Sequence, residues 1–244
     1  MPDVERITPY GTRASKGAQV EQMFDSIAPA YDLMNRMMTL GIDRLWRAKA
    51  VGLLRRSAPR DVLDVATGTG DLAILLARRL PRARITGVDL SSGMIAIGRK
   101  KIRKAGLDSR VTLAEADCLA LPFADASFDC ITVAYGVRNF ADILAGLREM
   151  HRVLRPGGSL CIIELSTPVN PVVKPLYRLY TRGVIPAVGR LVSHDSRAYT
   201  YLPESIAAVP QRDEMCALMT RAGLRDATFR PLTLGVCTIY LARK

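Results

Sequence analysis

The sequence has few cysteines and no segment that could cross a membrane. Only five of its 244 residues are cysteine, and no two of them lie closer than twelve positions apart. An odd number of thiols at such spacing predicts neither a disulfide framework nor a zinc or redox motif. No apolar run approaches the roughly 18–20 residues that span a bilayer, and residues 1–10 lack the apolar stretch of a signal peptide. We therefore expect a cytoplasmic protein with reduced thiols and no bound metal.

Acidic residues are scarce relative to basic ones. The chain carries 35 Lys and Arg against 23 Asp and Glu, a net charge of +12. A surface of this sign attracts polyanions such as nucleic acid or the anionic face of a membrane, although a basic surface that is merely solvated gives the same count. The 49% hydrophobic content excludes disorder, and the length favours one large α/β domain.

Short apolar runs and helical patterns alternate through the middle of the chain. Strands are predicted at 62–65, 84–88, 111–113, 128–134 and 159–165, and helices at 71–80, 91–105 and 141–154, with further helices within 18–57 and 170–222. The alternation predicts right-handed crossovers and a parallel sheet covered on both faces. Residues 226–232 and 236–241 are joined too closely for a crossover, so we expect them to form an antiparallel terminal hairpin.

A glycine loop follows the first predicted strand. Residues 64–71 read DVATGTGD and lead into the helix predicted at 71–80. Gly68 and Gly70 allow the backbone to approach a ligand closely and tolerate positive φ, while the helix behind them offers unpaired N–H groups. Because ligands of doubly wound sheets bind beyond the carboxyl ends of the strands, this loop predicts a ligand site.

Acidic residues follow the next two strands. Asp89 ends the second strand, where a carboxylate can accept hydrogen bonds from both hydroxyls of a ribose. Asp117 and Cys118 follow the third strand, where an adenine would lie in this geometry. The loop and the acids together predict an adenine nucleoside site.

A nicotinamide-dependent dehydrogenase is an alternative, because residues 68–73 also satisfy the dinucleotide pattern G-x-G-x-x-G/A. Three features oppose it. Asp64 lies inside the first strand, where dinucleotide folds carry apolar residues, and the terminal hairpin replaces a second mononucleotide half. Tyr240 and Lys244, the one Tyr-x-x-x-Lys pair, would lie roughly 13 Å apart on a predicted strand.

The glycine loop, the two acids and the terminal hairpin resemble those of the class I S-adenosylmethionine-dependent methyltransferases. Five further stretches are similar to one family in that class, the ubiquinone/menaquinone biosynthesis C-methyltransferases. They are MFDSIAPAYDLMN (23–35), LGIDRLW (40–46), FDCITVAYGVRN (128–139), RVLRPGGSLCIIELS (152–166) and YTYLPESI (199–206). The resemblance implies an α/β, Rossmann-like fold with a mostly parallel seven-stranded sheet, an antiparallel terminal hairpin and helices on both faces.

We expect a single methyltransferase domain over residues 1–244, because no repeat, low-complexity tract or linker divides the chain. A helical cap would cover residues 1–57, the cofactor-binding core 58–165, a helical lid insertion 166–224 and the terminal hairpin 225–244.

The resemblance also implies a reaction, the transfer of a methyl group from S-adenosylmethionine to demethylmenaquinol. The benzoquinol precursor of ubiquinone is the alternative substrate, although the stretch LGVCTIY (234–240) favours the naphthoquinol. The chain departs from the family at Ala134, where some members have serine, and at Asp43, where many have histidine. We therefore assign no cofactor contact to Ala134 and no histidine role at position 43. The implied cofactor contacts are Gly68, Thr69, Gly70, Asp89, Asp117 and Cys118.

The chemistry of ring methylation suggests further residues. An aromatic carbon is a poor nucleophile until the adjacent hydroxyl ionises, so the protein must align the ring, accept the phenolic proton and stabilise the oxyanion. Arg138 and Asn139 follow the fourth strand, where a substrate oxygen could meet them, and Tyr31 is a candidate for relaying the proton or orienting the ring. A structural ion pair for Arg138 and a packing role for Tyr31 are the alternatives.

The polyprenyl tail of such a substrate resides in a bilayer, so the protein must visit the membrane. Asn170 and Pro171 are predicted to start a helix that ends at Gly183, with basic residues four apart and apolar residues between them. From 165 to 192 there are four basic residues and no acidic one. This pattern predicts a helix at the anionic inner face of a membrane, unless the helix only covers the sheet. The basic stripe comprises Lys174, Arg178 and Arg182.

Nucleic-acid methylation is the rival function, because the positive charge permits it. However, the fourth strand ends in AYGV (134–137) rather than in the Asn/Asp-Pro-Pro-aromatic loop of base N-methyltransferases. No Pro-Cys loop that could attack a base is present, and no RNA-binding module is appended. We therefore expect no nucleic-acid partner, and the sequence leaves a homodimer open.

Overall fold

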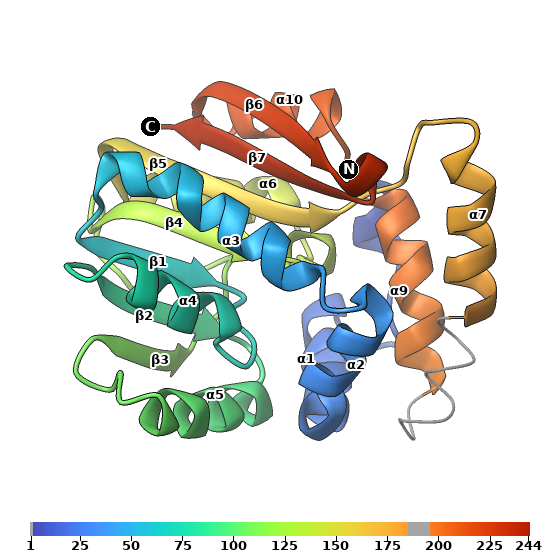
Figure 1. Ribbon diagram of the computed structural model, residues 1–244, viewed down its shortest axis with the longest axis horizontal. Coiled ribbons are helices and arrows are strands. Elements are labelled where there is room, and N and C mark those ends of the chain that lie inside the picture. Colours follow the sequence, from blue (N-terminus) through green and yellow to red (C-terminus); the bar gives the residue numbers. More distant parts are fainter. Residues whose placement is uncertain (1, 185–195) are drawn as a thin grey trace.

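The computed structural model describes residues 2–184 and 196–244 (Figure 1). Its centre is one seven-stranded sheet with the order β3-β2-β1-β4-β5-β7-β6. β1 to β5 run parallel, whereas β7 lies antiparallel between β5 and β6. The predicted sheet and its antiparallel terminal hairpin are confirmed. The strands are β1 (Asp61–Val65), β2 (Arg84–Asp89), β3 (Val111–Glu115), β4 (Phe128–Ala134), β5 (Leu154–Leu165), β6 (Arg225–Leu232) and β7 (Cys237–Arg243).

One strand boundary differs from the sequence pattern. β5 begins at Leu154 rather than at residue 159, because Leu154 pairs with Phe128 before the register shifts. The apolar pattern could not reveal this early pairing, since residues 155–158 of the strand are RPGG.

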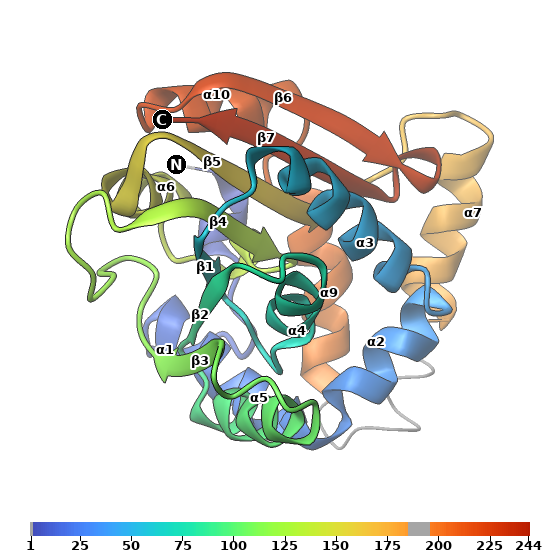
Figure 2. The ribbon, with the colours of Figure 1, turned by 60° about the vertical axis from the view of Figure 1, so that its left-hand side comes forward.

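Helices cover both faces of the sheet (Figures 1 and 2). α3, α4 and α5 pack on one face, and α6 and α10 on the other. On β1, Val62 faces the first group while Leu63 and Val65 face the second, so the central strand is apolar on both sides. The helices are α1 (Lys16–Ile27), α2 (Tyr31–Thr39), α3 (Asp43–Leu54), α4 (Asp71–Arg79), α5 (Ser92–Lys104), α6 (Ile143–Val153), α7 (Val173–Leu179), α9 (Ser196–Ala208) and α10 (Asp213–Arg221).

The chain order creates a crevice at the carboxyl ends of the strands. From β1 the chain moves outward to β2 and β3 and then returns to the other side of β1 as β4. The loops after β1 and β4 therefore diverge at the point where ligands of such sheets bind. Figure 1 shows α1, α2, α7 and α9 gathered beyond these strand ends.

The predicted start of the helix at 91–105 is confirmed, whereas the helix predicted from Asn170 to Gly183 begins later, at Val173, and ends differently. Residues 185–195 of the helical region predicted at 170–222 lie outside the described residues. Ser91 starts α5 as expected, since its hydroxyl accepts a hydrogen bond from the backbone N–H of Met94 at 3.1 Å. Asn170 likewise accepts from the backbone N–H of Val172 at 2.9 Å, ahead of α7. Gly183 does not end that helix, because a π-helical turn continues to Val184. No helix within the described ranges has the length and apolarity needed to cross a bilayer.

Candidate active site

A buried carboxylate supports the glycine loop. Asp64, 1% exposed, accepts hydrogen bonds from the hydroxyls of Thr67 and Thr132, each at 2.6 Å. The loop then turns through Gly68 at φ +56° and Gly70 at φ +77°, a left-handed backbone that glycine adopts without strain. These contacts explain why a carboxylate lies inside this strand.

Asp64 gives the protein a predictable response to pH. Burial raises the pKa of its carboxyl to about 6, although the two threonine hydroxyls act to lower it. Because the pKa is higher in the folded chain than in the unfolded chain, this group favours folding at low pH, and its contribution is lost as the pH rises through 6. The free energy of unfolding of the wild type, relative to Asp64→Asn, should be about 2 kcal/mol larger at pH 4 than at pH 8. Urea unfolding of both proteins measures this, and a difference that does not change with pH would contradict it.

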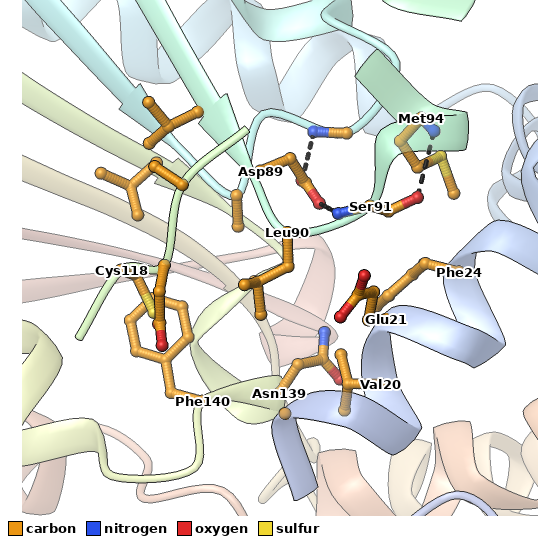
Figure 3. Close-up of a pocket in the computed structure, with 18 of the residues that line it drawn as sticks. Val20, Glu21, Phe24, Asp89, Leu90, Ser91, Met94, Cys118, Asn139 and Phe140 are labelled. Atoms are coloured by element: carbon orange, nitrogen blue, oxygen red, sulfur yellow. Dashed lines mark hydrogen bonds between the residues drawn. The ribbon is translucent and has the colours of Figure 1, made fainter. Parts of the chain in front are cut away.

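Asp89 ties the end of β2 to the glycine loop. Its oxygens accept hydrogen bonds from the backbone N–H of Gly68 at 2.7 Å and of Ser91 at 3.0 Å (Figure 3). Burial raises the pKa of Asp89, while these backbone hydrogen bonds lower it. The carboxylate lies in the wall of a cavity of about 280 Å³, which we call the first cavity.

The first cavity brings most of the predicted nucleoside contacts together. Those that line it are Gly68, Asp89, Asp117 and Cys118, joined by Tyr31 and Asn139. Thr69 and Gly70 are not part of this lining. The hydroxyl of Thr69 donates to Asp32 at 2.6 Å and accepts from Lys101 at 2.9 Å, and Gly70 precedes α4. The side chain of Thr69 therefore connects the glycine loop to α2 and α5, and Gly70 leads into α4.

The helical cap covers the first cavity. Glu21 and Phe24 project into it from α1 (Figure 3). Phe24 belongs to the stretch 23–35 that resembles the family, whereas no motif in the sequence includes Glu21. Asp25, on the same helix, accepts hydrogen bonds from the hydroxyl of Ser91 at 2.5 Å and the backbone N–H of Gly93 at 3.0 Å. α1 is thereby fixed to the start of α5.

A lysine on α5 fixes α2 in the same way. The ammonium of Lys101 pairs with Asp32 of α2 at 2.6 Å and with Asp71 of α4 at 2.5 Å. All three side chains are partly exposed, so each pair contributes modestly to stability. Their effect is positional, because they hold α2 against the glycine loop.

A second cavity, of about 310 Å³, lies beside the first. Its walls come mainly from α2, α3, α7, α9 and the turn between β6 and β7, and most of the lining side chains are apolar. Tyr31 and Tyr135 line both cavities. The two cavities therefore meet at these two rings.

Arg138 belongs to the second cavity. Its Nη1 donates to Glu164 at 2.7 Å and also to the backbone carbonyl of Tyr135. Burial alone would lower the pKa of Arg138, but the adjacent Glu164 carboxylate raises it above its usual value. The ion pair foreseen as the structural alternative is present, and Arg138 is also among the residues that line the second cavity.

The other two catalytic candidates are Asn139 and Tyr31. Asn139 lines the first cavity, where Figure 3 shows its amide nitrogen directed inward, and its amide oxygen accepts a hydrogen bond from Tyr201 at 3.2 Å. Burial raises the pKa of Tyr31, although a hydrogen bond with Asn35 and the charge of Arg138 lower it. Tyr31 therefore stays protonated near neutral pH and suits a donor better than a base.

A buried ion pair on α3 was not predicted from the sequence. Asp43 and Arg47 form an ion pair in the wall of the second cavity, and Asp43 also accepts from Thr39 at 2.8 Å. The guanidinium carbon of Arg47 lies 5.8 Å from the centre of the Tyr135 ring. Asp43 and Arg47 lie four residues apart on a helix, and this spacing favours an ion pair. It does not predict that the pair lines a cavity.

Comparison with known proteins decides the family. The model of the ubiE/COQ5 methyltransferase family matches residues 12–244. The chain belongs to this family. It is 53% identical to a demethylmenaquinone methyltransferase of Porphyromonas gingivalis, over 100% of both chains. It is 45% identical to the ubiquinone/menaquinone biosynthesis C-methyltransferase UbiE of Geobacter sulfurreducens, over 98% of this chain and 93% of the other.

The fold is that of a class I S-adenosylmethionine-dependent methyltransferase. A solved structure of such an enzyme from Aquifex aeolicus aligns with a TM-score of 0.55 and 22% identity, over 75% of this chain and 81% of the other. The first cavity fits the cofactor of this family. A Cβ at Gly68 would point to the Tyr31 ring, 3.9 Å away, so the glycine leaves room between them. The Asp89 carboxylate in the same wall suits the ribose hydroxyls.

Proposed function

We propose that this protein transfers a methyl group from S-adenosylmethionine to the ring of demethylmenaquinol. One observation carries the proposal: a nucleoside-sized cavity containing Asp89 meets an apolar cavity containing Arg138, and the rings of Tyr31 and Tyr135 lie where they join. A methyl donor and an aromatic acceptor would face each other at this junction. The full-length identity to a demethylmenaquinone methyltransferase supports the naphthoquinol as acceptor.

The residues that line the two cavities have different roles, cofactor binding in the first cavity and quinol binding in the second. S-adenosylmethionine, when bound, supplies a methyl group already activated by its positive sulfur. Asp89 and the backbone at Gly68 would hold its ribose, and Asn139 would face it across the cavity. Arg138 stabilises the naphtholate that forms when the quinol hydroxyl beside the reacting carbon loses its proton. Tyr31 orients the ring by donating a hydrogen bond. After the ring carbon gains the methyl group it gives up its own proton, the ring becomes aromatic again and the oxygen regains the proton it lost, so one proton in all passes to solvent.

The direct test is transfer of a labelled methyl group to chemically reduced demethylmenaquinol, with the benzoquinol precursor assayed beside it. We expect labelling of the naphthoquinol and a lower rate with the benzoquinol. Labelling of the benzoquinol alone would overturn the choice of substrate. Labelling of neither, in a protein that still binds the cofactor, would overturn the proposed reaction.

We also propose that the mouth of the second cavity rests on a membrane. All large exposed hydrophobic side chains of the described residues lie on α2, α3, α7 and adjoining turns, or on the β6–β7 turn, and each of these elements contributes to the second cavity. In the segments 33–45, 165–184 and 232–236 the one acidic residue is Asp43, which is buried against Arg47. This docking face comprises Leu33, Met37, Leu40, Leu45, Val169, Val172, Leu176, Leu179 and Leu234.

The docking face is basic as well as apolar. Arg178 is exposed on α7 and Lys174 is half-buried there, whereas the side chain of Arg182 and the whole of Arg190 lie outside the described residues. An apolar face with basic residues and no exposed acid suits an anionic bilayer, from which a prenylated quinol could enter the cavity directly.

Liposome co-sedimentation tests the docking face. The double variant Leu176→Ser/Leu179→Ser should lower the partition coefficient onto phosphatidylglycerol vesicles at least tenfold, because two exposed leucines lose their burial in lipid. Arg178→Gln should lower it about fivefold. Arg221→Gln removes the same charge from α10 and serves as the control. Equal effects of the two arginine variants would contradict the assignment of this face.

A further inference from the structure

Two polar atoms in the wall of the second cavity have no hydrogen-bond partner. They are the hydroxyl of Tyr135 and Nε of Arg138, and both atoms are buried. No other buried side-chain nitrogen or oxygen in the described ranges is left in this state. Since an unpaired buried polar atom is costly, folded proteins rarely retain one without a reason. Two such atoms in one largely apolar cavity indicate a ligand with two polar groups.

The two residues line the cavity from different sides. Tyr135 lies between α3 and the start of β7, because the groups that act on the pKa of its hydroxyl include Cys237, Arg47 and Asp43. Arg138 lies toward α2 and α9, where the groups that act on its pKa include Tyr31 and Tyr201. A ligand that satisfied both atoms would therefore lie across the cavity.

The ring of Tyr135 is fixed in this position. Its backbone has φ +59°, a left-handed conformation that is unfavourable for a side chain of this size. Trp46 packs on the ring at 6.5 Å between centroids, and the guanidinium carbon of Arg47 lies 5.8 Å from its centre. Local strain retained beside two cavities is typical of a residue with a functional position.

We propose that the hydroxyl of Tyr135 binds the second ring oxygen of the quinol, the one para to the oxygen that faces Arg138. The inference rests on the proposed function, and it adds the specificity for a 1,4-diol. With both oxygens held, the ring spans the cavity, and its reacting carbon lies beside the Arg138-bound oxygen, next to the wall shared with the first cavity.

Tyr135 is better placed for this contact than the charged groups near it. The charge of Arg47 is already matched by Asp43, and by Asp71 at 3.3 Å. Burial raises the pKa of Tyr135 well above its usual value, so the group remains a neutral donor throughout the physiological range. A neutral hydroxyl can donate to a quinol oxygen without burying a further charge.

The experiment compares two substrates in two variants. The first substrate is 2-prenyl-1,4-naphthoquinol, and the second is 3-prenyl-1-naphthol, which keeps the hydroxyl beside the reacting carbon and lacks the other one. In Tyr135→Phe we expect kcat/KM to fall about tenfold for the diol, because one hydrogen bond to the substrate is lost. For the naphthol we expect kcat/KM to stay unchanged. The midpoint of thermal unfolding should not fall, because the hydroxyl has no protein partner to lose.

Tyr180→Phe is the matched control. Tyr180 also lines the second cavity, but its hydroxyl already donates to the carbonyl of Met38 at 2.6 Å. Its removal should change the rates with both substrates by the same factor. If Tyr135→Phe also changes both rates equally, or changes neither, the inference is overturned while the methylation itself stands. If the wild type methylates neither compound, the proposed function fails.

Discussion

Replacement of Arg138 by leucine is expected to cost the protein both activity and stability. The variant loses the charge that we propose stabilises the naphtholate, which should lower kcat by about 10²–10³. It also leaves Glu164, 2% exposed, as an uncompensated buried charge, which should lower the free energy of unfolding by about 3–5 kcal/mol. Methyl-transfer kinetics and urea unfolding measure the two effects separately.

A double variant separates these two roles. Glu164 also accepts hydrogen bonds from the backbone N–H groups of Arg138 and Leu165, at 3.2 and 2.9 Å. Arg138→Leu/Glu164→Gln removes the buried charge and keeps an amide oxygen for one of these donors. We expect it to recover most of the lost stability and none of the activity. A double variant that regained activity would show that Arg138 acts only as a structural ion pair.

Replacement of Asp89 by alanine is expected to weaken cofactor binding more than 100-fold. We propose that Asp89 accepts two charge-assisted hydrogen bonds from the ribose hydroxyls, each worth about 1.5–3 kcal/mol, and the variant would lose both. It also loses the acceptor that joins Gly68 to Ser91, so the glycine loop becomes less ordered. Isothermal titration with S-adenosylmethionine measures the change.

Asp89→Asn is the control for the loop. The asparagine side chain keeps an oxygen for one backbone N–H and loses the negative charge, so its binding should fall between those of the wild type and the alanine variant. If alanine changes the dissociation constant less than threefold, Asp89 does not hold the ribose. Quinol binding by either variant should stay unchanged, since Asp89 does not line the second cavity.

Periodicity and chain order were sufficient to predict the sheet. Strands such as β4 are apolar on both faces and end at turn residues, and a short link between the last two strands permits no crossover. Because strand ends must meet at one edge, the sequence also predicts that Gly68, Asp89 and Asp117 lie together, and all three line the first cavity. Such positions follow from topology alone.

The second cavity could not be predicted in this way. Its walls come from α2, α3, α7, α9 and the β6–β7 turn, and their mutual placement depends on tertiary packing that no local pattern encodes. Arg47 and Tyr135 are therefore indistinguishable in the sequence from ordinary helix and strand-end residues, and Asp43 stands out only as a departure from the family. Thr69 was expected at the cofactor, but its hydroxyl is bonded to Asp32, a contact across 37 positions.

The helix α2 connects the two cavities, and the sequence alone does not reveal this connection. This helix supplies Tyr31 to both cavities, and Lys101 fastens it to α4 and α5. Because α2 forms part of the wall of both cavities, any displacement of this helix would change the two cavities together. The three partly exposed charges of Asp32, Asp71 and Lys101 hold the helix in place, and salt weakens their attraction.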